Sequence, residues 1–310
     1  GCGIIESDYG STQIDSLCVI YDDKFSVVNT NDCPYELSKD SLNYIKSKHE
    51  KIDFLLTGYA GAGPYPQCFD MDEGEKIKEA NKKKINFLQM GINYINHLKP
   101  KFVLPFAGTY TLGGKFHFLN NVRGVPDIEY AKDYFKNNIS CKSDIILLNS
   151  NSFFDLEKEK ASEKYIDNRN DRDNYINKIL SKKKYDYEND EMPSTETLKK
   201  LCFDSIKRYN KVKESIKFIS QTYILIKISN ELWFIIDNKN NNHFIKSNDK
   251  IPKYKNYVSY VLDFRLLFKI LSGPRFAHWN NAEIGSHITF KRNPNNFERG
   301  LYYCMNFFHV

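Results

Sequence analysis

Short apolar runs of strand type alternate with amphipathic segments along the first half of the chain. Two β-rich runs, Ser16–Tyr21 and Lys24–Asn29, flank a turn of two aspartates, which predicts a hairpin. Strands that alternate with helices in this way predict a layered α/β architecture. The later strands are predicted at Ile52–Thr57, Lys101–Phe106 and Asp144–Leu148, and the helices at Ser38–His49, Asp72–Leu98 and Ile128–Lys136.

The longest predicted helix, Asp72–Leu98, repeats its apolar residues at helical spacing and ends before Pro100. A run of three lysines, residues 82–84, is expected on its solvated side. The stripe expected to face the core consists of Ile77, Ile85, Leu88, Ile92 and Ile95.

The pattern changes in the second half of the chain. From Asp155 to Met192 polar and charged residues dominate, which predicts a surface excursion with some helix. We therefore expect two parts, residues 1–155 and an α+β extension at residues 156–310. Elements predicted in the extension are a helix capped by Ser194, a hairpin of Thr222–Ile228 with Leu232–Asp237, a strand entering a helix at Tyr257–Leu271, a strand near Ile284–Lys291 and a last helix near Phe297–Phe308.

Composition narrows the class of protein. The 310 residues are 41% hydrophobic and 27% charged, which is typical of a globular chain. A net charge of +6 without a concentrated basic stripe argues against a nucleic-acid binder and fits a small anionic substrate. No apolar run is long enough to span a membrane and no signal peptide is visible. Seven cysteines without a C-x-x-C pair favour reduced thiols and a cytoplasmic protein.

Asp32 stands at the carboxyl end of the strand Lys24–Asn29. Glycine-containing loops follow the next two strands, at Gly58–Pro66 and Ala107–Gly114, and all three lie at one sheet edge if the strands run parallel. A carboxylate at such an edge can hold a metal with other ligands, although no His-x-His pair occurs in the chain. A turn aspartate that caps the next element is the alternative.

Both glycine loops are candidates for substrate binding. Gly61 and Gly63 allow backbone N–H groups to approach an anion, and the alternative is that the glycines serve only loop geometry. Thr109 and Tyr110 of the second loop are expected to line a pocket. His117, which follows that loop, is the candidate catalytic histidine, as a general acid or a ligand.

Arginine side chains are the candidates for the anionic end of a substrate, because the guanidinium binds phosphate or carboxylate through two N–H groups. We select Arg123 and Arg275 as substrate-binding residues. Arg275 lies between a helix stop and an aromatic pair where a sugar or base could stack, and a salt bridge to the core is the alternative. The set from which they come is Arg123, Arg265, Arg275, Arg292 and Arg299.

Several stretches together resemble one family, in their order and spacing. The resemblance is to the metallo-β-lactamase-like part of CMP-N-acetylneuraminate hydroxylase and its bacterial relatives, over most of the chain and most weakly across residues 155–256. The stretches are Val28–Cys33, Asp53–Pro66, Lys99–Gly108, Trp279–Gly285 and Arg292–Pro294.

This resemblance implies an αββα sandwich, of which residues 1–155 form the second half. Asp32 matches the aspartate that bridges the metals, Zn or Fe, and Ala107 stands where the final histidine is expected. The H-x-H-x-D-H loop would lie before Gly1, so an upstream half-domain or a homo-oligomer is a possible partner. Rieske-type Cys-x-His pairs are absent.

The function expected from the resemblance is a metal-dependent hydrolase acting on a small anionic substrate such as a sugar or nucleotide-sugar. A hydroxylase-type oxygenase that uses an external electron donor is one alternative. A non-catalytic module for substrate binding or assembly is the other, so the sequence leaves open whether the chain is an enzyme.

Overall fold

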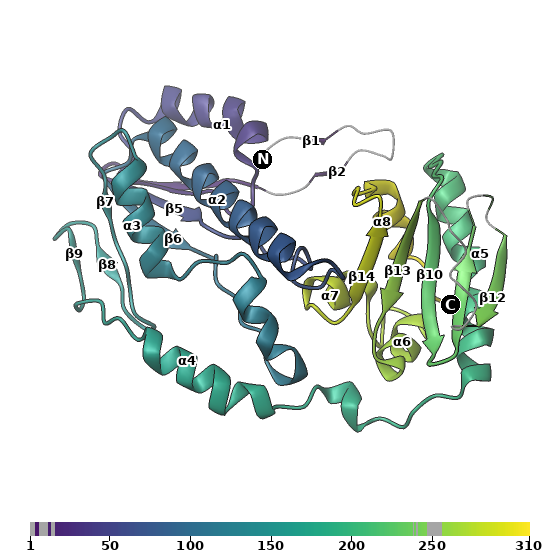
Figure 1. The fold of residues 1–310 in the computed structure, drawn as a ribbon. Coiled ribbons are helices and arrows are strands. Elements are labelled where there is room, and N and C mark those ends of the chain that lie inside the picture. The colour runs from purple at the N-terminus through teal and green to yellow at the C-terminus, as the bar shows by residue number, and fades with distance from the viewer. Residues whose placement is uncertain (1–3, 6–11, 14–15, 238, 240, 247–255) are drawn as a thin grey trace.

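The computed structural model describes residues 4–5, 12–13, 16–237, 239, 241–246 and 256–310. It consists of two lobes, each built on a five-stranded sheet (Figure 1). A short hairpin of β1 (Ile4–Ile5) and β2 (Thr12–Gln13) precedes the first lobe.

The sheet of the first lobe has the strand order β3-β4-β5-β6-β7. β4 to β7 run parallel, and β3 pairs with β4 in the antiparallel sense, so the predicted hairpin and the predicted α/β alternation are confirmed. The strands are β3 (Cys18–Tyr21), β4 (Ser26–Asn29), β5 (Phe54–Gly58), β6 (Phe102–Phe106) and β7 (Asp144–Ile145). The helices between them are α1 (Tyr35–Lys48), α2 (Glu73–Leu98) and α3 (Ile128–Asn138).

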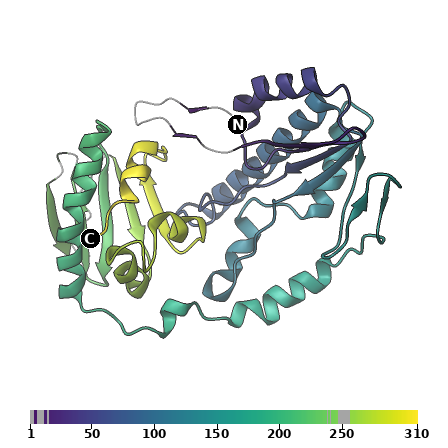
Figure 2. The same ribbon diagram turned by 180° about the vertical axis from the view of Figure 1, so that it is seen from behind.

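All three helices lie on one face of this sheet, as Figure 1 shows. Alternate strand residues face the helices, and Val28, Leu55 and Val103 are fully buried there. On the opposite face, presented in Figure 2, Phe54 and Phe102 contact Phe154 of the β8–β9 hairpin. The sheet is therefore covered by helices on one face and by a small hairpin on the other.

Helix α2 begins where its sequence predicts, because the Asp72 side chain accepts hydrogen bonds from the Gly74 and Glu75 amides. Three of the five residues predicted to face the core do so. Leu88, with Ile92 and Ile95, is buried, but Ile77 and Ile85 are 47% and 38% exposed. The helix is 26 residues long and the neighbouring strands have five, so its N-terminal half extends beyond the sheet (Figure 1).

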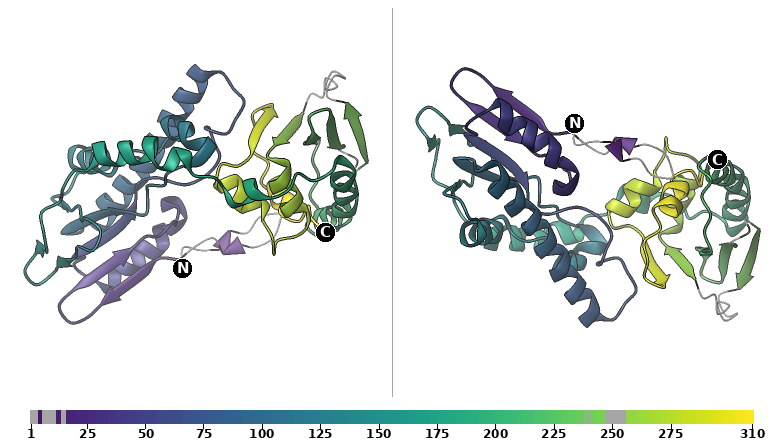
Figure 3. Two further views of the ribbon diagram at one scale, coloured as in Figure 1. Left: turned by 90° about the horizontal axis from the view of Figure 1, so that it is seen from below. Right: turned by 90° about the horizontal axis from the view of Figure 1, so that it is seen from above.

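The segment between the lobes is mostly short elements, in agreement with the polar composition. The predicted border between residues 155 and 156 falls inside the β8–β9 hairpin, and α4 runs along one side of the molecule towards the second lobe (Figure 3). The elements of this segment are β8 (Phe154–Asp155), β9 (Lys160–Ala161), α4 (Arg169–Lys178), η2 (Leu180–Lys182) and η3 (Asp186–Asn189). The short helix η1 (Gly114–Val122) lies earlier, between β6 and α3.

The second lobe has a mixed sheet with the order β12-β11-β10-β13-β14. Ser194 caps α5 as predicted, since its hydroxyl accepts from the Thr197 amide. The strand expected near Ile284–Lys291 begins only at Thr289, because residues 279–284 form the short helix α7. The elements are α5 (Thr195–Ser215), β10 (Tyr223–Ser229), β11 (Leu232–Ile236), β12 (Asn242–Lys246), β13 (Tyr257–Val261), α6 (Phe264–Leu271), α7 (Trp279–Ile284), β14 (Thr289–Asn293) and α8 (Arg299–Met305).

A loop of the first lobe pairs with the outer strand of the second. The Phe290 amide donates to the Cys68 carbonyl at 2.8 Å, and the Asp70 amide donates to the Phe290 carbonyl at 2.7 Å. The rings of Phe69 and Phe290 stack at 5.1 Å. Cys68 and Phe69 belong to the buried cluster that also holds the core of the second lobe, and we call this cluster the shared core because it contains residues of both lobes. The sheet and helices of the first lobe have a separate core of their own.

Replacing Phe69 by Ala should therefore weaken the whole molecule. We expect a loss of about 3–5 kcal/mol in the free energy of unfolding, because a buried ring is removed from the shared core. Denaturant unfolding measures this loss. Phe276→Ala is the matched control, since that ring is 62% exposed, and it should change the stability by less than about 0.5 kcal/mol. Equal losses in the two variants would contradict the shared core.

Candidate functional site

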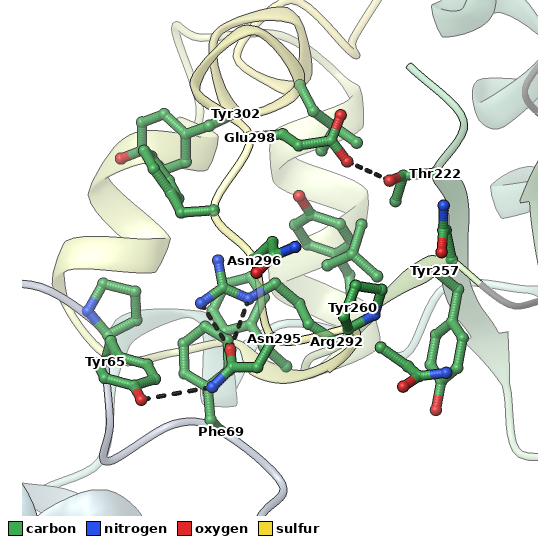
Figure 4. A pocket seen from close by; sticks show the side chains of 18 of the residues that line it. Tyr65, Phe69, Thr222, Tyr257, Tyr260, Arg292, Asn295, Asn296, Glu298 and Tyr302 are labelled. Carbon is green, nitrogen blue, oxygen red and sulfur yellow. Dashed lines mark hydrogen bonds between the residues drawn. The ribbon is translucent and has the colours of Figure 1, made fainter. Parts of the chain in front are cut away.

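A pocket with a volume of about 720 Å³ lies where the two lobes meet. This is within the usual range for small-molecule sites of ~300–1,000 Å³. The first lobe contributes the loop that follows β5, and the second lobe contributes β13, β14, α7, α8 and the turn between β14 and α8. Aromatic rings form much of the wall (Figure 4), namely Tyr65, Phe69, Tyr257, Tyr260, Phe290, Phe297 and Tyr302.

Arg292 of β14 places its guanidinium among these rings. Its carbon centre lies 4.5 Å from the centroid of the Phe69 ring. Nε and Nη2 donate to Asn295 Oδ1 at 3.2 and 3.0 Å, and the Asn295 amide in turn donates to the Tyr65 hydroxyl (Figure 4). Burial lowers the pKa of Arg292, but an arginine stays charged at any ordinary pH. The guanidinium is thus a cation held in a fixed position on an aromatic wall.

Glu283 of α7 also lines the pocket and is 1% exposed. No hydrogen-bond partner for its Oε1 atom is found within the described part of the chain. Burial raises the pKa of this carboxyl to about 8, although Tyr302 and Arg292 act in the opposite direction. Glu283 is therefore protonated at neutral pH, which is unusual for a glutamate and typical of functional sites.

The other carboxyl group in the wall, Glu298, is in a different environment. The hydroxyls of Ser220 and Thr222 donate to its two oxygens, and these contacts connect the start of α8 to the segment before β10. Figure 4 shows the contact with Thr222. The pocket consequently contains one carboxyl group that is neutral by burial and one that accepts two hydroxyl donors.

A second group of polar residues, which we call the Gln67 cluster, consists of Gln67, Lys83, Tyr110, Arg123 and Ser286. The Gln67 side-chain amide donates to the Gly63 carbonyl at 2.5 Å, to the Tyr110 hydroxyl at 3.3 Å and to Ser286 Oγ at 3.1 Å. Arg123 lies over the Tyr110 ring at 5.3 Å. Three residues selected from the sequence, Gly63, Tyr110 and Arg123, therefore lie together.

Lys83 connects the Gln67 cluster to the pocket wall, because its Nζ donates to the Tyr65 carbonyl at 2.9 Å. Burial lowers the pKa of Lys83 to about 8, and the nearby Arg123 adds to this effect. Two side-chain atoms of the cluster, Gln67 Oε1 and Arg123 Nε, are buried without a partner in the part that the structure describes.

The remaining predicted residues lie elsewhere. Thr109 hydrogen-bonds the Tyr59 hydroxyl, and Gly61 packs so closely on the Phe87 ring that an added Cβ would lie 2.2 Å from it. His117 lies in η1, where its Nδ1 contacts the Gly114 carbonyl at 3.0 Å. Arg275 is exposed in the turn between α6 and α7 and does not line the pocket.

Asp32 is exposed in the turn after β4. Because β4, β5 and β6 are parallel, Asp32 and both glycine loops share one sheet edge, as expected. Among the residues that the structure describes, no group of three or more His, Cys, Asp or Glu side chains could hold a metal ion. The described residues do not form a Zn or Fe site around Asp32, and such a site would need further ligands.

Sequence reasoning missed the two most informative residues of the pocket. Arg292 was one of five arginines without a distinguishing local pattern. Glu283 carried a usable signal: it is an acidic residue between Ala282 and Ile284, four positions after Trp279, in a short segment of otherwise uncharged residues. A carboxyl group at a helical position on the buried side is uncommon and points to a special environment.

Comparison with known proteins adds no family: no protein-family model, no curated protein and no solved structure matches this chain. Within the described residues, none of the helices has the length and apolar character that crossing a membrane requires.

The protonation of Glu283 should appear in the pH dependence of stability. Its pKa is raised from 4.5 to about 8 by folding, so the folded state holds the proton more tightly than the unfolded state. Stability should fall by up to about 1.4 kcal/mol per pH unit between these two values. Urea unfolding of Glu283→Gln from pH 5 to 8 should lack this part of the slope. An unchanged slope in the variant would show that Glu283 is ionised in the folded protein.

Proposed function

We propose that this chain binds a small organic anion that carries a ring, in the pocket between the lobes. The observation that carries the proposal is the position of Arg292 among aromatic rings in a cavity of about 720 Å³. A guanidinium that is fixed by Asn295 and backed by Phe69 can bind a carboxylate or phosphate with little loss of side-chain freedom.

The rest of the wall supports a ring-bearing ligand. The faces and edges of Tyr65, Tyr257 and Phe297 offer stacking surfaces for a sugar or a base. Asparagine side chains at positions 293, 295 and 296 supply neutral donors and acceptors around the rim. Apolar walls with a few polar groups are the usual composition of a small-molecule site. Among the functions expected from the sequence, a substrate-binding module matches this geometry best.

The second candidate is a metal-dependent hydrolase of the metallo-β-lactamase fold. It is supported by the first lobe, where all helices lie on one face and Leu56, Leu104 and Phe106 remain only partly buried on the other. In an αββα sandwich that second face would pack against the sheet of another half. Asp32 would then bridge a metal together with ligands supplied by that half, and the sugar or nucleotide-sugar would bind nearby.

Binding is tested by calorimetry with benzoate, phenyl phosphate, N-acetylneuraminate and cytidine monophosphate. We expect at least one of these anions to bind, and Arg292→Gln to weaken it about 10–100-fold, because a charged hydrogen bond contributes about 1.5–3 kcal/mol. Arg275→Gln is the matched control: an exposed arginine is removed outside the pocket, and affinity should change less than about twofold. Loss of affinity in the Arg275 variant alone would move the site to the turn between α6 and α7.

The second candidate is tested by metal analysis of the purified full-length protein. Stoichiometric zinc or iron that is lost in Asp32→Ala and retained in Asp23→Ala, a turn aspartate at the other end of β4, would support it. His117→Ala in the same assay tests the role proposed for that histidine. Protein without stoichiometric metal would contradict the metal-dependent hydrolase.

A further inference from the structure

The guanidinium of Arg292 has a hydrogen-bond partner on one edge only. Nε and Nη2 donate to Asn295 Oδ1 at 3.2 and 3.0 Å, which occupies the inner edge of the group (Figure 4). The outer edge consists of Nη1 and the second hydrogen of Nη2, and it has no partner among the described residues. Nη1 is not one of the buried unpartnered atoms, in contrast to Arg123 Nε. The outer edge is therefore accessible in a residue that lines the pocket.

The charge of Arg292 is not paired with an acid. In the part of the chain that the structure describes, neither Glu283 nor Glu298 forms an ion pair with it, and other arginines make all the arginine ion pairs. Arg292 is also the one lysine or arginine among the described residues of the pocket wall. Its partner Asn295 is a neutral amide, which fixes the guanidinium without cancelling its charge.

The first lobe sets the orientation of the Asn295 amide. Asn295 Nδ2 donates to the Tyr65 hydroxyl at 3.4 Å, and that hydroxyl donates to Glu79 Oε2 at 2.9 Å. A carboxylate only accepts and a guanidinium only donates, so the two ends of this chain determine the direction of every bond in it. With Nδ2 turned to Tyr65, the amide oxygen faces Arg292. Glu79 lies in the N-terminal half of α2, the half that extends beyond the first sheet.

Resting on the proposed anion-binding function, we propose that Asn295 is the positioning residue that determines the specificity of the pocket. Oriented by Glu79 through Tyr65, it holds the inner edge of Arg292 and leaves the outer edge to a ligand. The ligand class that fits is a monocarboxylate with a ring, because two carboxylate oxygens match two parallel N–H groups and one negative charge matches one cation. The rings of Tyr65 and Phe297, each 6.0 Å from the guanidinium carbon, lie beside this edge for stacking.

The main test is Asn295→Asp, with the binding of benzoate and of uncharged benzamide measured by ligand-observed NMR titration at pH 7. The new carboxylate would pair with the inner edge of Arg292 and neutralise its charge. We expect the affinity for benzoate to fall about 10–100-fold and that for benzamide to change less than about twofold. A merely structural role of Asn295 would lower both affinities together. Asn295 is exposed, so the variant should fold, which its thermal unfolding verifies.

Asn296→Asp is the matched comparison, because it adds the same charge to the same turn. No hydrogen bond between Asn296 and Arg292 is present in the described structure, so the added charge would act only through solvent. We expect benzoate affinity to fall about threefold, well below the loss in Asn295→Asp. Equal losses in the two variants would show a general effect of charge at the rim and would overturn the role of Asn295.

The hydrogen-bond chain from the first lobe is tested by a double-mutant cycle. Tyr65→Phe keeps the ring and removes the hydroxyl, and Glu79→Gln replaces the carboxylate that gives the chain its direction. Each should weaken benzoate binding about threefold, and the double variant should lose no more than one of them, because both act through Asn295. Additive losses would overturn the role of the chain.

Wild-type affinity for benzoate in Asn295→Asp would overturn the role of Asn295 while leaving anion binding intact. Tighter binding of phenyl phosphate than of benzoate by the wild type would overturn the carboxylate assignment. If none of the anions binds the wild type, the proposed function fails together with this inference.

Discussion

The backbone pairing of residues 68–70 with β14 is the interaction on which the rest of the structure depends. Two hydrogen bonds attach the loop after β5 to the second sheet, and the stacked rings of Phe69 and Phe290 fill the space beside them. Leu112 and Leu119, which follow β6, enter the same buried cluster. The lobes are thus held by shared core packing as well as by polar contacts, such as that between Lys115 and Asp263 at 3.0 Å. The pocket exists because this junction brings the β5 loop against β14.

Much of the fold follows from local patterns in the sequence. Buried strands such as Phe54–Gly58 are continuous apolar runs, and Asp72 and Ser194 are strong helix caps, so element type and most boundaries were predictable. The packing of these elements against one another was not predictable. The apolar stripe on α2 continues past the end of the sheet, and a periodic pattern does not show where the sheet that the helix packs against ends. The strand expected near Ile284–Lys291 begins only at Thr289, because the helix α7 runs to Ile284.

The sequence predicted part of the Gln67 cluster, whose selected residues come from the segments after β5 and β6. Gly63, Tyr110 and Arg123 were selected from the sequence, and the structure brings them together in the Gln67 cluster. The pocket itself combines a loop at residues 64–69 with strands and helices at residues 256–302. Such a combination depends on the packing of the two lobes, which no local pattern encodes. Arg275 had the more suggestive neighbours, yet the fold leaves it exposed and places the half-buried Arg292 among aromatic rings.

The position of β14 has one more consequence. It is the outer strand of the second sheet, and an outer strand exposes backbone groups that can pair with another chain. In the first lobe, the loop after β5 occupies part of that edge through the bridge between Phe69 and Phe290. The first lobe therefore acts as an intramolecular cover against edge-to-edge association. A second lobe separated from the first would expose the edge of β14 and would be prone to aggregation. The first lobe is therefore needed to keep the second lobe in solution as well as to complete its core.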